Sequence, residues 1–286
     1  MTWILLACGS VLFFTSLNLL QRIVAVESKN PRAMAVVFNF IAAVIALLIF
    51  FTMGSFRDFT LSTSPKAWLA LVVASFCYAM FERGRFVASK LLDASVLTTV
   101  MNISVLVAFI SAIFLYSEPL TSHKLLGGIL IITALVIVSL NNNKTKTKKS
   151  SAKGVAIAVL ISIMLGLGWA LDKLGAQSFN AETYSIFIWT VPVIFIYFPR
   201  VKFSAIKSEL KIASWRVFAL AGLNVVGYLL QLKALETAEA TRVIPIVQTS
   251  TLFTVLMGIL FLKERQHILR KIIAGVTAIA GVYFLI

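Results

Sequence analysis

Ten long apolar stretches follow one another along this chain, separated by short polar segments. They cover roughly residues 2–21, 33–53, 67–86, 94–116, 123–140, 154–174, 182–198, 214–232, 239–262 and 268–286. A helix needs roughly 20 apolar residues to cross the hydrocarbon core of a bilayer. We therefore predict an all-α polytopic membrane protein with ten transmembrane helices. No basic residue precedes the first stretch, which is also too long for the apolar core of a leader, so we expect it to be retained.

The composition argues against the alternative, a large soluble all-α protein. Hydrophobic residues make up 60% of the chain, charged residues only 13%, and the mean hydropathy is +0.97. A soluble domain of this size needs more polar side chains to cover its surface. Cys8 and Cys77 both fall within apolar stretches, so we expect small buried side chains and not a disulfide.

Two segments of the chain, residues 94–118 and 240–264, resemble each other at a constant offset of 146. Each begins with small and polar residues, continues as an apolar run and ends in a glutamate. The identical pairs are Ala94 and Ala240, Ser104 and Ser250, Leu106 and Leu252, Ile113 and Ile259, and Glu118 and Glu264. We therefore predict two similar five-helix halves, residues 1–140 and 154–286, joined by the basic linker 141–153.

The basic residues are distributed unevenly between the loops. Of 26 lysines and arginines, 20 lie in or beside the first, third, fifth, seventh and ninth loops, and 6 lie in or beside the even-numbered loops. The positive-inside rule then places the odd loops in the cytoplasm and both termini outside. Five helices per half also make the halves inverted repeats. The basic residues form no single face, so nucleic-acid binding is not supported despite the net charge of +15.

Several short motifs resemble the EamA-type transporters of the drug/metabolite transporter superfamily. These are residues 116–120 (YSEPL) before Gly127 and Gly128, residues 262–265 (LKER) before Gly275, residues 165–170 (LGLGWA), and Ala234, Leu235, Ala238, Ala240 and Pro245. The resemblance covers nearly the whole chain and implies a transporter of two five-helix repeats. The first half departs from it, with Thr15 and Thr99 where the repeat predicts tryptophan and proline. The resemblance also implies cytoplasmic termini, which disagrees with the charge distribution, and the orientation stays open.

Charged side chains near the end of the third stretch are the strongest candidates for a binding site. Polar groups are costly inside a membrane unless they are paired or face a cavity. Glu82 and Arg85 are three residues apart and share a helix face, whereas Arg83 points elsewhere. An arginine recognises a carboxylate through two parallel hydrogen bonds, so we expect Arg83 and Arg85 to hold an anionic group. The alternative is that the helix ends near Met80 and leaves these charges at the interface.

The repeat places a second polar stripe opposite the first. At the offset of 146, Tyr78, Glu82 and Arg85 correspond to Asn224, Tyr228 and Gln231. The latter three follow one face of the eighth stretch, at spacings of four and three. They are expected to line a central cavity; helix-to-helix hydrogen bonding is the alternative.

Other polar residues lie inside the remaining apolar stretches. They are Asn18 and Asp172, which correspond at an offset of 154, with Asn39, Asn102, Ser104, Gln248 and Ser250. Trp169 and Trp189 would form aromatic walls of the cavity or anchor helices at the interface. Glu82 and Asp172 are the acidic groups expected deep enough in the membrane to exchange a proton.

Four residues near the ends of the related segments are expected to be structural. Glu118 and Glu264 would each satisfy exposed amides at the start of the following helix. His123 and His267 would sit beside a helix terminus. The sequence contains no metal-binding, nucleophile or phosphate-loop motif, so we expect no cofactor and no enzymatic activity.

We therefore predict a transporter that exports small organic metabolites, such as amino acids or organic acids, by alternating access through a central cavity. The predicted substrate-binding residues are Glu82, Arg83, Arg85, Asn102, Trp169, Asn224, Tyr228, Gln231 and Gln248. Helices one, three, four, six, eight and nine would line the path. Gly127, Gly128, Gly275 and Gly281 would allow close helix contacts.

The expected partners are a small-molecule substrate and membrane lipids, and the expected state is a monomer or a homodimer in the cell (inner) membrane. Four alternatives stay open: a lipid-head-group flippase, a cationic drug exporter, an intramembrane lipid-modifying enzyme, and a sensor or scaffold.

Overall fold

The structure is a computed structural model that describes residues 2–23, 28–59, 61–92, 94–139, 152–261 and 268–286. Those residues form twelve α-helices and one short 3₁₀ helix, with no strand among them. The elements are α1 (Thr2–Ile23), α2 (Pro31–Thr52), η1 (Ser55–Asp58), α3 (Pro65–Leu91), α4 (Ala94–Met101), α5 (Ile103–Tyr116), α6 (Ser122–Ser139), α7 (Ala152–Phe179), α8 (Ala181–Tyr197), α9 (Phe203–Thr237), α10 (Ala240–Gln248), α11 (Ser250–Phe261) and α12 (Ile268–Leu285). The predicted linker 141–153 lies almost wholly outside the described residues.

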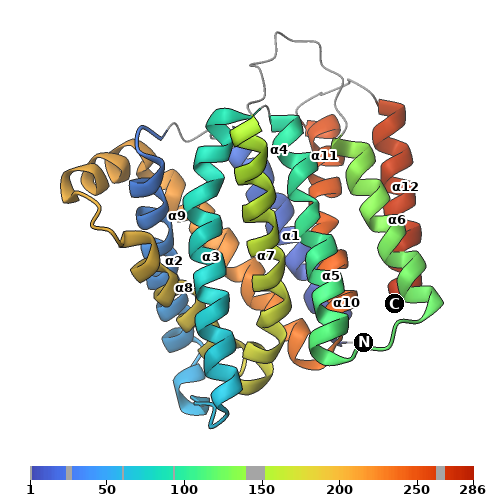
Figure 1. Cartoon of the computed structure of the whole chain (residues 1–286), viewed down its shortest axis with the longest axis horizontal. Coiled ribbons are helices and arrows are strands. Elements are labelled where there is room, and N and C mark those ends of the chain that lie inside the picture. The colour runs from blue at the N-terminus through green and yellow to red at the C-terminus, as the bar shows by residue number, and fades with distance from the viewer. Residues whose placement is uncertain (1, 24–27, 60, 93, 140–151, 262–267) are drawn as a thin grey trace.

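The helices stand side by side and alternate in direction (Figure 1). One end of the bundle, here called the terminal end, carries the start of α1, the C-terminus, and the loops at residues 53–64, 117–121 and 238–239. The opposite end carries the last turns of α1 and α3 and the start of α7. It is here called the basic end, because the basic residues between positions 200 and 211 lie there.

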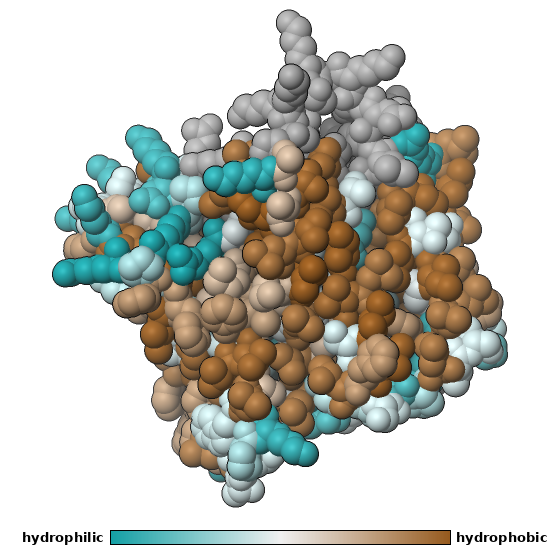
Figure 2. Space-filling view, in the orientation of Figure 1, coloured by the Kyte–Doolittle hydropathy of each residue, from teal (hydrophilic) through white to brown (hydrophobic). Residues whose placement is uncertain are grey.

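Every predicted apolar stretch is helical, and six helices are long and apolar enough to cross a bilayer. These are Thr2–Leu20, Pro31–Thr52, Pro65–Arg85, Thr99–Tyr116, Ala152–Phe179 and Phe203–Thr237. Ser122–Ile137, Ala181–Tyr197 and Ile272–Leu285 are apolar but shorter. Figure 2 shows brown, apolar side chains covering much of the face between the two ends, as expected for a surface in contact with lipid. The chain is an integral membrane protein; the count of ten spans stays a prediction.

The two halves pack on each other through matching pairs of helices. α3 packs on α7 and α1 packs on α9, while α2 contacts α8, α5 contacts α10, and α6 contacts α12. The α6–α12 contact is close because Gly127 and Gly281 face each other: a Cβ on Gly127 would lie 2.8 Å from the carbonyl oxygen of Gly281. Two of the four glycines expected to allow close helix contacts therefore do so within the chain.

Three expectations change in the structure. α3 continues to Leu91, so the alternative that it ends near Met80 is wrong, and Glu82 and Arg85 are helical. Cys77 is buried, but Cys8 is exposed on α1, so the expected burial of Cys8 is wrong. Residues 203–213, expected as a loop, form the first part of α9, which turns at Ser214.

Candidate functional site

The interior of the bundle contains one large cavity of about 280 Å³. Helices α1 to α5 and α7 to α11 contribute residues to its wall. Of these, α2 and α8 were not among the helices expected from the sequence to line the path. Its lining residues are Phe14, Leu17, Asn18, Asn39, Tyr78, Phe81, Glu82, Arg85, Met101, Asn102, Ser104, Val105, Leu165, Trp169, Ile188, Trp189, Asn224, Tyr228, Gln231, Gln248, Ser250 and Thr251.

Glu82 and Arg85 form an ion pair on the wall of this cavity. Arg85 Nη2 lies 2.8 Å from Glu82 Oε2, and the two side chains are 23% and 8% exposed. The guanidinium also lies over the rings of Phe38 and Phe81, at 5.0 and 5.7 Å from their centroids. Such cation–π contacts hold an arginine in place while keeping its charge available to the cavity.

Arg83 lies on the opposite side of α3. Its Nη1 donates a hydrogen bond of 3.2 Å to the backbone carbonyl of Phe198, and Arg83 does not line the cavity. The spacing explains this placement, because adjacent positions on a helix are about 100° apart. The structure therefore does not bring Arg83 to the site with Arg85, and we remove it from the candidate site.

The stripe predicted on α9 faces the cavity. Asn224, Tyr228 and Gln231 all line it, and the ring of Tyr228 packs edge-on against Trp189 with centroids 5.6 Å apart. Gln231 is only 1% exposed. Asn102, Trp169 and Gln248 also line the cavity, as do Asn18, Asn39, Ser104, Trp189 and Ser250.

Outside the Glu82–Arg85 pair, three buried polar atoms on the cavity wall make no hydrogen bond within the described part of the chain. They are Trp189 Nε1, Tyr228 Oη and Gln231 Nε2. Buried polar atoms of folded proteins are nearly always hydrogen-bonded, so such atoms call for a partner. Because all three residues border the cavity, water or a polar ligand inside it would supply that partner.

Two helices are broken where they pass the cavity. The break between α4 and α5 falls at Asn102, and the break between α10 and α11 falls at Thr249. Each contains a 3₁₀-type hydrogen bond, from Val105 N to Asn102 O at 3.1 Å and from Leu252 N to Thr249 O at 2.9 Å. A short 3₁₀ segment inside a helix often marks a hinge. The breaks fall at nearly the same repeat position, next to polar residues of the lining.

Asp172 lies on α7 behind the cavity wall and is 0% exposed. Tyr78, which lines the cavity, donates its hydroxyl to Asp172 Oδ2 at 2.5 Å, and Tyr184 donates to Oδ1 at 3.2 Å. Gly175 makes room for the Tyr184 ring, since a Cβ there would overlap it. Asp172 is therefore separated from the cavity by one tyrosine hydroxyl.

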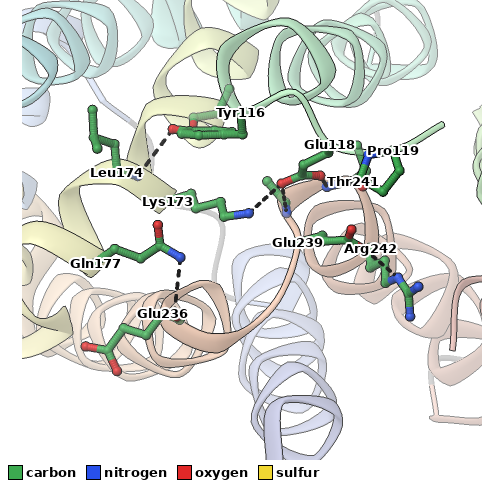
Figure 3. A network of polar contacts seen from close by, with 12 residues as sticks. Tyr116, Glu118, Pro119, Lys173, Leu174, Gln177, Glu236, Glu239, Thr241 and Arg242 are labelled. Carbon is green, nitrogen blue, oxygen red and sulfur yellow. Dashed lines mark hydrogen bonds and ion pairs between the residues drawn. The ribbon is translucent and has the colours of Figure 1, made fainter.

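A polar network joins the two halves of the chain at the terminal end (Figure 3). Glu118 Oε1 lies 2.7 Å from Lys173 Nζ and accepts from the amide of Ala240 at 2.9 Å. Glu118 Oε2 accepts from the amide and hydroxyl of Thr241, at 3.0 and 2.6 Å. Burial disfavours the ionised carboxylate, but Lys173 and these donors outweigh it, so the pKa of Glu118 is lowered.

The partner helix of Glu118 differs from the expectation. We expected its carboxylate to satisfy amides of the following helix, α6, but it binds the first amides of α10 in the other half. The start of α6 instead uses Thr121, whose hydroxyl accepts from the amide of Lys124 at 3.3 Å. Glu264 and His267 lie outside the described residues, and His123 is exposed.

Two further ion pairs lie beside this network, formed by buried Lys124 and by the partly exposed Glu239 and Arg242. Lys124 Nζ lies 2.6 Å from Glu239 Oε1, and Arg242 Nε lies 2.7 Å from Glu239 Oε2. Tyr116 donates to the carbonyl of Ala170 at 2.6 Å, which fixes the end of α5 against α7. The halves of the chain are thus fastened to each other at the terminal end.

Sequence reasoning missed Lys173 and Tyr184. Lys173 directly follows Asp172, and adjacent residues on a helix do not face each other; its partner, Glu118, lies 55 positions away. Tyr184 is separated from Asp172 by 12 positions and lies on the next helix. Of these two residues, only Tyr184 could have been suspected from the sequence, because it belongs to a polar turn at the start of an apolar helix.

Comparison with known proteins identifies a transporter family and a solved structure of similar fold. A profile described as the EamA-like transporter family matches residues 1–140 and 152–286. A solved structure described as "Crystal structure of protein" aligns with a TM-score of 0.75 at 12% identity, covering 98% of this chain and 94% of the other. At that identity the likeness concerns the fold alone. A comparison with curated protein sequences finds no match.

Proposed function

This chain belongs to the EamA-like transporter family, within the drug/metabolite transporter superfamily, and on that premise we propose that it transports a small carboxylate-bearing metabolite through the central cavity. The resemblance seen in the sequence is thereby confirmed for the family. The observation that carries the proposal is the cavity wall. It combines the ion pair of buried Glu82 and partly exposed Arg85 with three further buried polar atoms that have no hydrogen-bond partner among the described residues.

The substrate class follows from the chemistry of that wall. Arg85 would bind a carboxylate through its planar guanidinium, and Glu82 keeps it oriented. Asn102, Asn224, Gln231 and Gln248 would pair with polar groups on the rest of the molecule. Ligand pockets usually start at about 300 Å³, so a cavity of about 280 Å³ suits a small solute such as an amino acid or organic acid.

The two ends of the bundle support an alternating-access mechanism. Glu118, Lys173 and the start of α10 hold the two halves together at the terminal end, which supports entry from the basic end in this conformation. The matching helix pairs α3–α7 and α1–α9 are what two inverted repeats would form. The breaks at Asn102 and Thr249 would act as hinges when the terminal end opens.

Asp172 is the second acidic group of the proposed mechanism. Its carboxylate reaches the cavity through Tyr78, so a proton taken up by Asp172 would alter that hydrogen bond and thereby the shape of the site. We assign Asp172 and Glu82 as the groups that would couple transport to protons. Net export would then use the proton gradient.

The test compares two arginines that lie two positions apart. We would measure the thermal stability of the purified protein with a panel of amino acids, organic acids and cationic amphiphiles. A ligand at 100 times its Kd stabilises by about 2.7 kcal/mol. Stabilisation by a carboxylate should be lost in Arg85→Ala and kept in Arg83→Ala, which faces away from the cavity.

The alternative transporter functions make a different prediction in the same test. Glu82 is 6% exposed and lines the cavity, so it could hold a cation instead. Stabilisation only by cationic amphiphiles, lost in Glu82→Gln, would indicate a drug exporter. Stabilisation only by phospholipid head groups would indicate a flippase.

A further inference from the structure

The first part of α9, residues 203–213, lies apart from the rest of the helix. The helix turns at Ser214, where φ is 52° and ψ is −145°, so residues 203–213 and 215–237 run in different directions. Figure 1 shows the first segment lying across the basic end, at the edge of the bundle. Eleven residues at about 1.5 Å per residue give a helix about 16 Å long.

Glu209 fixes this segment to the bundle. Its side chain is buried, and Oε1 accepts from the backbone amides of Lys29 and Asn30, at 3.0 and 2.7 Å. These amides precede α2, whose cap is Asn30. These contacts fix which side of the segment packs against the bundle. They therefore also fix which side is exposed.

The exposed face is graded from apolar to basic to small polar residues. Going round the helix from its buried side, the exposed side chains come in the order Leu210, Phe203, Lys207, Lys211, Ser204 and Ser208. A helix lying in a membrane interface shows this order: its apolar residues reach the acyl chains, its lysines lie at the head groups, and its polar residues face water.

The charged residues on either side of the segment are also basic. Between positions 200 and 216 the chain has five basic residues and one acidic residue, the buried Glu209. In the part of the chain that the structure describes, no ion pair involves Lys202, Lys207 or Lys211. Figure 2 shows the hydrophilic side chains gathered at this corner of the molecule.

Trp215 lies at the turn between the two segments and is 62% exposed. Tryptophan is enriched where the hydrocarbon of a bilayer meets its head groups. Its position directly after Ser214 marks the depth at which α9 passes from the surface into the membrane.

We propose that residues 203–213 form an interfacial helix that binds anionic phospholipid head groups through Lys207 and Lys211. The charge of the exposed face selects the lipid, since each lysine near an anionic membrane surface contributes to the attraction. Phe203 and Leu210 hold the segment at the depth where its lysines meet the phosphates. The assignment requires only that the protein lies in a bilayer, and it stands whether or not the proposed substrate is correct.

The test places a reporter on the water-facing side of the segment. Ser208→Cys in a Cys8→Ser, Cys77→Ala background carries a bimane label, and the full-length protein is reconstituted in phosphatidylcholine vesicles. Small amounts of nitroxide-labelled phosphatidylglycerol or phosphatidylcholine are added, and the quenching gives their relative association. We expect the anionic lipid to associate more strongly, and 1 M salt to remove the difference.

The decisive comparison is between two pairs of substitutions. Lys207→Gln with Lys211→Gln should lower the relative association of phosphatidylglycerol by up to about thirtyfold, since each lysine near the surface contributes about 1 kcal/mol. Arg57→Gln with Lys66→Gln, at the terminal end, should leave it unchanged. Equal quenching by both lipids would overturn the proposal, as would a preference that survives loss of both lysines. Absence of quenching by either lipid would also overturn it and would indicate water or a protein partner on this face. Melting curves check that each variant is folded.

Discussion

Lys173 and Glu118 form an ion pair between the two halves of the chain, with Lys173 Nζ 2.7 Å from Glu118 Oε1. Glu118 also binds the first two amides of α10, so one carboxylate joins α5, α7 and α10. The glutamate that ends the repeated segment of the first half therefore joins that half to the second one. In the alternating-access mechanism that we propose, opening of the terminal end would have to break this contact.

The first prediction concerns the stability of this contact. Replacing Glu118 with glutamine leaves Lys173 without its partner in a buried site, and breaking a buried pair costs about 3–5 kcal/mol. Glu118→Gln should therefore lower the melting temperature clearly. Glu182→Gln is the control, because the side chains of its pair with Lys233 are 20% and 30% exposed and exposed pairs contribute about 0–1 kcal/mol. Equal effects of the two substitutions would contradict the role of Glu118.

The same residue predicts how stability depends on pH. The pKa of Glu118 is lowered in the folded state, so its contribution is fully present above the unfolded value of about 4.3 and is lost as the pH falls through the folded pKa. Melting curves between pH 7 and pH 3 should show this loss for the native protein. In Glu118→Gln, stability should fall less between pH 7 and pH 3, because the contribution of the Glu118 carboxylate is already missing. An identical pH dependence of stability in both proteins would refute this role of Glu118.

The third prediction concerns Gly175. A Cβ at this position would overlap the ring of Tyr184, which donates to Asp172. Gly175→Ala should therefore destabilise the protein by about 1–3 kcal/mol, as overpacking does. Gly222→Ala is the matched control, because a Cβ there meets no atom within 4 Å. It should leave the melting temperature unchanged or raise it slightly.

The fourth prediction concerns Asp172. If Asp172 exchanges the coupling proton, Asp172→Asn should abolish accumulation driven by a pH gradient but retain exchange of labelled for unlabelled substrate. Asparagine keeps an acceptor for the hydroxyl of Tyr78. Loss of both activities in a protein that still melts normally would assign Asp172 to substrate binding instead. Retention of both would remove it from the mechanism.

The fifth prediction decides the orientation, on which the charge distribution and the family resemblance disagree. Lys66 lies at the terminal end and Lys202 at the basic end, and both are exposed. The charge distribution predicts that a membrane-impermeant maleimide labels Lys66→Cys in intact cells, and Lys202→Cys only after permeabilisation. Cys8 is replaced by serine in both variants. The reverse result would favour cytoplasmic termini.

The sequence predicted the membrane class and the helical stretches because long apolar runs leave few other structures. The family was predicted from the resemblance of short motifs. It also predicted which face of α9 carries Asn224, Tyr228 and Gln231, since helical spacing determines that face. Eight of the nine predicted substrate-binding residues line the cavity; their contact with substrate stays a prediction. Arg83 does not line the cavity, because it is one position from Glu82 and adjacent residues of a helix point about 100° apart.

Contacts between distant parts of the chain could not be predicted. Glu118 binds α10, more than 120 positions away, and nothing in the local sequence identifies that partner. The same holds for Tyr78 and Asp172, separated by 94 positions. The segment 203–213 was hidden for a different reason: with three lysines and one glutamate at positions 202–211 it is too polar for a span, and short amphipathic helices resemble loops in hydropathy.

The most direct test of the central claim is counterflow in proteoliposomes. Vesicles loaded with an unlabelled amino acid or organic acid are diluted into a trace of the labelled compound, for each member of the panel. We predict that at least one carboxylate accumulates transiently in vesicles with the native protein and with Arg83→Ala, and not with Arg85→Ala. The account would be contradicted if native protein of normal stability exchanged no carboxylate above the level of empty vesicles, or if Arg85→Ala exchanged it as fast as the native protein.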